Sequence, residues 1–170
     1  MEALQAILTR RSIRQYTPQP VPDEAIHELL AAAMQAPSAG NQQPWHFVVV
    51  TGHGQREALA GVLPHGQMLR TAPLGIVVCC DTEPLRHPAF WVQDCSAATE
   101  NLLLAAHALG LGGVWLGVYP NEERVAGIRR VLGLPGQVVP LCALALGYPA
   151  VKPEPPSRRY DEARVHRDRW

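Results

Sequence analysis

Apolar residues recur at intervals of three and four positions in several segments, and this spacing predicts amphipathic helices. Residues 2–10 carry a short pattern of this kind, and a stronger one begins at residue 23 and ends before Pro37. The longest pattern covers residues 91–109 and has many small residues beside its apolar stripe. We expect this helix to lie at the centre of the fold. Asn121 is suited to cap a further helix, with acidic residues in its first turn.

Short apolar runs bounded by glycine, proline or polar residues predict strands. Four such runs cover residues 47–51, 74–80, 114–118 and 138–146. With one more helix between the first two strands, the predicted order is helix, helix, strand, helix, strand, long helix, strand, helix, strand. This alternation predicts a mixed β-sheet flanked by helices.

The composition changes after Gly147, where prolines interrupt a polar stretch that ends in aromatic and basic residues. Such a stretch has little core of its own, yet Tyr160 and Trp170 gain nothing from staying in water. We therefore expect it to lie across the domain or across a partner subunit. The chain divides into one domain, residues 1–148, and a C-terminal extension of that domain, residues 149–170.

Composition narrows the classes of function. The chain has 170 residues, of which 47% are hydrophobic and 18% charged, as in a single globular domain. The formal net charge is zero, which gives no overall attraction to nucleic acid or to an acidic membrane. No apolar run approaches the length of a membrane span, and the N-terminus lacks a signal-peptide pattern. We expect a cytoplasmic protein with a small-molecule partner, no nucleic acid and no membrane.

Cysteine spacing favours neither disulfides nor a zinc site. Three of the four cysteines stand in apolar runs and no CxxC pair occurs, so we expect buried thiols. No two histidines have the spacing of a helical metal pair, so we expect no metal.

An arginine cluster is the first candidate site. Arg10, Arg11 and Arg14 surround Ser12 and offer several charged donors and a hydroxyl within a few residues. A phosphate accepts forked, charge-assisted hydrogen bonds from such a set. The alternative is a solvated helix end whose positive charges interact with the helix dipole.

The loop at residues 36–45 is the second candidate, because it places small residues and amides between a helix and a strand. Small residues let a backbone approach a flat ligand closely, and the amide side chains of Asn41 and Gln43 can form hydrogen bonds with its polar edge. An ordinary helix-to-strand loop is the alternative.

Other sequence patterns are weaker candidates for a functional site. The glycines of residues 110–117 follow a helix and precede a strand, the reverse of a dinucleotide-binding fingerprint. Asp94 and Glu100 on the long helix are acid or base candidates only if a pocket reaches them, and a solvated helix face is the simpler interpretation.

Together, these pieces resemble the FMN-dependent nitroreductase family, especially its shorter members. Four segments carry the resemblance in order: RRSIRQY at 10–16, APSAGNQQPWHFVVV at 36–50, DCSAATENLLLAAHALGLGGVWLG at 94–117 and RVHRDRW at 164–170. The resemblance implies an α+β fold and a homodimer with two FMN molecules in clefts at the interface. It also implies that the C-terminal tail is exchanged between subunits.

The resemblance also implies roles for individual residues. Arg10, Arg11, Ser12 and Arg14 would hold the phosphate and ribityl chain of FMN, and Arg158 or Arg159 would return to the phosphate. The partner subunit would contribute Pro37, Ser38, Ala39 and Asn41. The backbone of Trp115, Leu116 and Gly117 would approach the flavin ring. Residues 63–70 are where we expect contacts at the flavin rim or substrate, with His65 and Gln67 as the candidates.

The implied activity is reduction of nitroaromatic, quinone or similar small acceptors, with NADH or NADPH as the electron donor. Both substrates would use the same place in turn, which gives ping-pong kinetics, and the flavin would carry the chemistry without a catalytic side chain. Longer members have an inserted lid where this chain has only residues 81–90, so we expect an open pocket with a broad or different substrate preference. Two alternatives stay open: specialised flavin chemistry, such as flavin degradation or oxygen-dependent oxidation, and a non-catalytic flavin-binding module.

Overall fold

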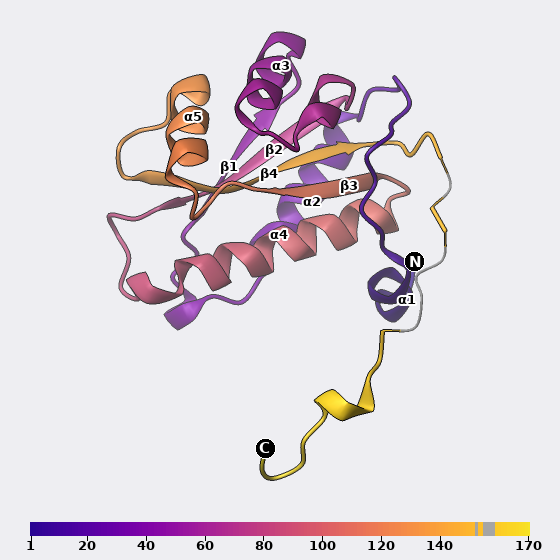
Figure 1. Cartoon of the computed structure of the whole chain (residues 1–170), viewed down its shortest axis with the longest axis vertical. Coiled ribbons are helices and arrows are strands. Elements are labelled where there is room, and N and C mark those ends of the chain that lie inside the picture. The colour runs from indigo at the N-terminus through magenta and orange to yellow at the C-terminus, as the bar shows by residue number, and fades with distance from the viewer. Residues whose placement is uncertain (152, 155–158) are drawn as a thin grey trace.

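A computed structural model describes residues 1–151, 153–154 and 159–170 (Figure 1). Its helices are α1 (Ala3–Thr9), α2 (Asp23–Met34), α3 (His53–Val62), α4 (Trp91–Ala108) and α5 (Glu122–Leu132). Its strands are β1 (Trp45–Val50), β2 (Leu74–Asp81), β3 (Gly112–Gly117) and β4 (Val138–Gly147). The predicted order of elements and the α+β fold are confirmed. None of the described helices is both long and apolar enough to cross a membrane.

The sheet has the strand order β1-β2-β4-β3, and all three pairings are antiparallel. The mixed sheet that we predicted is wrong in this detail. Alternating helices and strands identify the segments, but they do not fix the end at which each connection returns the chain. Parallel pairing in the described residues is confined to an isolated bridge between Ser12 and Gly113.

Helices cover both faces of the sheet, with α2 and α4 on one and α3 and α5 on the other (Figure 1). Strand β2 shows why, because its side chains alternate between two cores: Ile76 and Val78 face α4, whereas Val77 faces α3 and α5. Only a strand buried on both faces needs such a continuous apolar run.

The four cysteines are buried free thiols, as predicted. Burial raises the pKa of Cys79 and of Cys142 to about 12, so both remain protonated near neutral pH.

The segment that carries the arginine cluster docks on the edge strand β3. Ile13 is buried, and its backbone N–H donates to the carbonyl oxygen of Gly113 at 3.0 Å. Gly112 makes this approach possible, because a Cβ there would lie 2.5 Å from Cγ1 of Ile13. The phenolic oxygen of Tyr16 lies 2.8 Å from the carbonyl of Ala145 and fixes the far end of the segment. The backbone around Ser12 and Arg14 is therefore held by its buried neighbours.

We predict that Gly112→Ala destabilises the fold by roughly 1 to 3 kcal/mol, the usual cost of overpacking. The added methyl group would displace Ile13 at its Cβ, which is too close to the backbone to move by rotation alone. Urea unfolding measures the effect. Gly54→Ala is the matched control, because a Cβ at Gly54 meets nothing within 4 Å. Equal stabilities of the two variants would contradict the docking described above.

Candidate functional site

A cavity of about 300 Å³ lies beside the end of β3. Its lining consists of Arg14, Leu63, Pro64, His65, Trp115, Leu116, Gly117 and Arg124. Three stretches that the sequence singled out, far apart along the chain, therefore meet at one place. The volume is at the low end of the range for small-molecule pockets.

The wall of this cavity combines exposed backbone with positive charge. The space beside Gly117 is open, since a Cβ there would meet nothing within 4 Å, and a flat ring can approach the main chain. Arg124 donates from Nη1 to the carbonyl oxygen of Gly117 at 3.0 Å. Arg14 lines the same cavity. Sequence reasoning missed Arg124, whose position on α5 gives no signal before the fold is known.

The rest of the arginine cluster follows α1 without being part of it. Helix α1 ends at Thr9, and Arg10 is its C-cap, so an interaction of Arg10 with the helix dipole stays open as the alternative. Arg10 is half-buried and its Nε donates to Oε1 of Glu100 at 3.1 Å. Arg11 is half-buried, and Ser12 is exposed. These three residues do not line the cavity around Arg14.

A second contact fixes α1 on α4. Thr9 Oγ1 donates to the carbonyl of Gln5 at 2.6 Å, so its oxygen is left to accept from Nε2 of His107 at 2.8 Å. Partial burial, with a smaller contribution from the nearby charge of Arg10, lowers the pKa of His107 and favours its neutral form. The arginine cluster is thus attached to the C-terminal half of α4.

The loop that contains Pro37, Ser38, Ala39 and Asn41 lies at the opposite end of α4 (Figure 1). Gly40 and Asn41 both have positive φ, 55° and 53°, which gives the loop a tight shape. Ser38 Oγ accepts from the backbone N–H of Gln43 at 3.0 Å. The loop residues do not line the cavity around Arg14. Within one chain, therefore, the two candidate binding segments remain apart.

Asp94 on the first turn of α4 holds this loop. Its exposed fraction is 4%, so the solvated face that we predicted for it is wrong. Its Oδ1 accepts from the backbone N–H of Ala39 at 2.9 Å and its Oδ2 from Nε2 of Gln42 at 2.7 Å. The carboxylate is buried because these donors compensate its lost hydration. Glu100 is also not free, since it pairs with Arg10.

His65 and Gln67 lie in two adjoining cavities. His65 lines the cavity with Arg14, whereas Gln67 lines a neighbouring one of about 400 Å³ that shares Leu63, Pro64 and Arg124 with it. Gln67 is exposed, and its Nε2 donates to the carbonyl of Ala60 at 3.3 Å.

Residues 159–170 stand away from the domain (Figure 1), whereas the backbone N–H of Ala150 donates to the carbonyl oxygen of Gln15 at 2.9 Å. Arg159 is exposed, Tyr160 has an exposed fraction of 61%, and Trp170 is fully exposed. Arg158, the other predicted phosphate ligand of the tail, lies outside the described residues.

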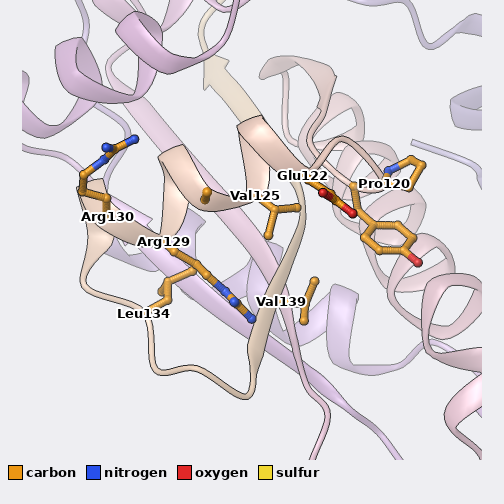
Figure 2. Close-up of a pocket in the computed structure, with 9 residues that line it drawn as sticks. Pro120, Glu122, Val125, Arg129, Arg130, Leu134 and Val139 are labelled. Carbon is orange, nitrogen blue, oxygen red and sulfur yellow. The ribbon is translucent and has the colours of Figure 1, made fainter.

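A larger cavity of about 610 Å³ lies between α5 and the start of β4, and Figure 2 shows its lining. Arg129 points into the turn below α5 and donates to the carbonyls of Gly136 at 2.6 Å and Val138 at 3.0 Å, whereas Arg130 points away. The guanidinium of Arg129 is thus used to hold the turn. Among the described residues, none that the sequence predicted as a ligand lines this cavity.

Comparison with known proteins places these features in a family. The family model described as "Nitroreductase family" matches residues 7–67 and 55–148. A protein of Methanothermobacter thermautotrophicus, provisionally named NADH dehydrogenase/NAD(P)H nitroreductase, is 51% identical over 172 residues, which cover 100% of this chain and 88% of that protein.

Two solved structures support the same family assignment. A protein of Parabacteroides distasonis with the same provisional name has a TM-score of 0.94 and 41% identity, with coverage of 99% of this chain and 98% of that one. A Desulfovibrio desulfuricans protein, provisionally named a nitroreductase and solved in complex with FMN, has a TM-score of 0.85 and 35% identity, with coverage of 100% and 98%. The fold, the ordered segments and these matches show that this chain belongs to the nitroreductase family.

Proposed function

We propose that this protein is an FMN-dependent oxidoreductase, which takes electrons from NADH or NADPH and reduces small acceptors such as nitroaromatics or quinones. The observation that carries the proposal is the cavity in which Arg14 meets the backbone of residues 115–117. A relative of the same length and fold was solved in complex with FMN, and another bears the name NAD(P)H nitroreductase.

The residues present fit FMN. Arg14 and Arg124 offer guanidinium donors, which bind phosphate or a polar ring edge by charge-assisted hydrogen bonds. The open space beside Gly117 admits a flat ring against main chain, and Trp115 lines the same wall. Arg10, Arg11 and Ser12 lie on the segment that Ile13 anchors, and we assign them to the phosphate and ribityl chain.

Bound FMN would supply the capacity to accept and then give up a hydride. The protein itself would bind and orient FMN, and it places guanidinium charge beside the cavity. We assign no catalytic side chain and expect donor and acceptor to bind in turn at the same place. His65 and Gln67, on adjoining cavities, are our candidates for substrate contacts.

We further propose that the site is completed by a second copy of the chain. The loop Pro37–Asn41 is held at the first turn of α4, whereas α1 is held at His107. Asp94 and His107 are thirteen residues apart, or roughly 20 Å along a helix. In a dimer, Pro37, Ser38, Ala39 and Asn41 of one copy would meet the arginine cluster of the other.

The tail supports the same arrangement. Its rings are exposed in the single chain, and burial on a partner would stabilise them. Residues 149–170 would then pack on the second subunit and bring Arg158 or Arg159 to the phosphate. Exposed apolar side chains of α1, Leu4, Ile7 and Leu8, provide further surface for such an interface.

We predict that the purified protein is yellow, that it releases FMN and not FAD, and that it oxidises NADH or NADPH with menadione as acceptor. The cavity offers arginines for one terminal phosphate, and the sequence has no dinucleotide fingerprint. Absorbance, chromatography of the released flavin and steady-state rates measure this. Turnover no faster than with free FMN would indicate a flavin-binding module, and a requirement for air would indicate specialised flavin chemistry.

We predict that Arg14→Ala weakens FMN binding by roughly 1.5 to 3 kcal/mol, the range for hydrogen bonds to charged groups, and leaves the fold intact. Quenching of flavin fluorescence measures the affinity. His27→Ala is the control, because His27 is exposed on α2 and lines neither this cavity nor the adjoining one. Wild-type affinity in Arg14→Ala would remove Arg14 from the site.

We predict that a chain ending at Gly147 loses FMN affinity and dimer stability together. The tail would supply both apolar burial and an arginine to the partner, and a ligand that binds only the assembled state stabilises that state. Analytical ultracentrifugation with and without FMN measures the two effects. A monomer of this shortened chain that carries FMN would mean that one chain builds the whole site.

A further inference from the structure

Asp94 is the buried carboxylate that the proposed function leaves without a role. It stands in the first turn of α4 beside the loop of residues 37–41, and its two oxygens accept hydrogen bonds from different parts of that loop, the backbone of Ala39 and the side chain of Gln42. A buried carboxylate is costly unless its donors are in place, so the loop conformation and the charge depend on each other.

Gln42 extends this contact to the loop before α4. Its Oε1 accepts from the backbone N–H of His87 at 3.0 Å, and its Nε2 lies 3.1 Å from the carbonyl oxygen of His87. Arg86 donates from Nη2 to the carbonyl of Gly40 at 3.1 Å. The imidazole of His87 lies against Gly40, where an added Cβ would be 2.6 Å from its Nε2. The backbone N–H and carbonyl of His87 and the guanidinium of Arg86 therefore add to the contacts that Asp94 makes with the loop.

These contacts hold the loop in a backbone conformation that is rare for residues other than glycine. Asn41 and Gln43 have φ of 53° and 48°, a region that non-glycine residues seldom adopt. Such a conformation persists where its surroundings specify it. The side chain of Asn41 is exposed, and that of Ser38 is half-buried. The loop is thus rigid at its base and keeps polar groups at its surface.

We propose that Asp94 is a positioning residue that fixes the loop of one subunit for binding FMN in the other subunit. This inference rests on the proposed function, because it requires a flavin site shared between two copies. Asp94 does not itself touch the ligand. It acts through Ala39 and Gln42, which set the shape of the segment from Pro37 to Asn41.

Replacement of Asp94 by Asn tests the need for two acceptors. An amide offers one oxygen and one NH₂, so whichever way it turns, its NH₂ faces a donor from Ala39 or from Gln42. Gln42 cannot turn its own amide in compensation, because His87 uses both of its ends. The change keeps the size of the side chain and removes one acceptor.

We expect Asp94→Asn to raise the Kd for FMN by about tenfold or more, the effect of losing one hydrogen bond to a charged group. Fluorescence quenching measures the affinity, and circular dichroism checks the fold. Asp23→Asn is the matched control, since Asp23 also lies in the first turn of a helix but is exposed. Gln42→Leu removes the same contact from the loop side and takes the place of Asp94→Asn if that variant does not fold.

A mixed dimer separates positioning across the interface from general damage. One subunit carries Arg14→Ala and the other Asp94→Asn, each with a different affinity tag. If the loop acts on the partner, one site combines both defects, whereas the other combines an intact arginine segment with an intact loop. We expect this dimer to regain one FMN site of wild-type affinity, although neither homodimer has any.

The absence of a tight site in the mixed dimer would overturn the proposal, because each site would then contain one defect from its own chain. Wild-type affinity in the Asp94→Asn homodimer would overturn it as well. Failure of the wild-type protein to bind FMN would contradict the proposed function itself, and is measured first.

Discussion

Helix α4 is the element on which the rest of the structure depends. It packs beneath the sheet and contacts α1 and α2 as well as the strands. Its first turn holds the loop of residues 37–41 through Asp94, and its C-terminal half holds α1 and Arg10 through His107 and Glu100. A rigid helix of 18 residues therefore sets the spacing between the two candidate binding segments.

This spacing connects fold to function. The arginine segment docks on β3 through Ile13, and the cavity beside it has open space at Gly117, where an added Cβ would meet nothing within 4 Å. The loop at the other end of α4 has polar groups and does not line that cavity. We propose that a two-fold symmetric dimer completes both sites, because the loop of each chain would then meet the arginine segment of the other. In this proposal the exposed apolar side chains of α1 and the exposed rings of Tyr160 and Trp170 would supply surface for the interface.

The sequence predicted the helices and strands well because the apolar pattern reports burial directly. Strand β2 is a continuous apolar run since both its faces are covered, and α5 begins after Asn121, whose side chain accepts from the N–H of Arg124. The relative direction of the strands was not predictable, because the hydrophobic pattern of a strand is the same whether it pairs in a parallel or an antiparallel manner. The antiparallel order follows from how connections return, which depends on tertiary packing.

The candidate site was predictable where its residues lie in segments that resemble the family. Arg14 and residues 115–117 meet in one cavity, and both stretches were recognised from the ordered resemblance. Arg124 was missed and Asp94 was misjudged, because their roles come from contacts between elements that are distant in the sequence. A charged residue on a helix is usually solvated, and only the loop that folds over Asp94 makes it an exception.

Sedimentation velocity of the full-length protein, monitored by flavin absorbance over a dilution series, tests the central claim most directly. The claim is that one FMN site needs residues from two chains. We predict that flavin absorbance sediments only with the dimer. As dilution converts dimer to monomer, the sedimenting flavin absorbance should fall in proportion to the dimer fraction. Flavin that sediments with the monomer at undiminished affinity would contradict this account, because the site would then be complete within a single chain.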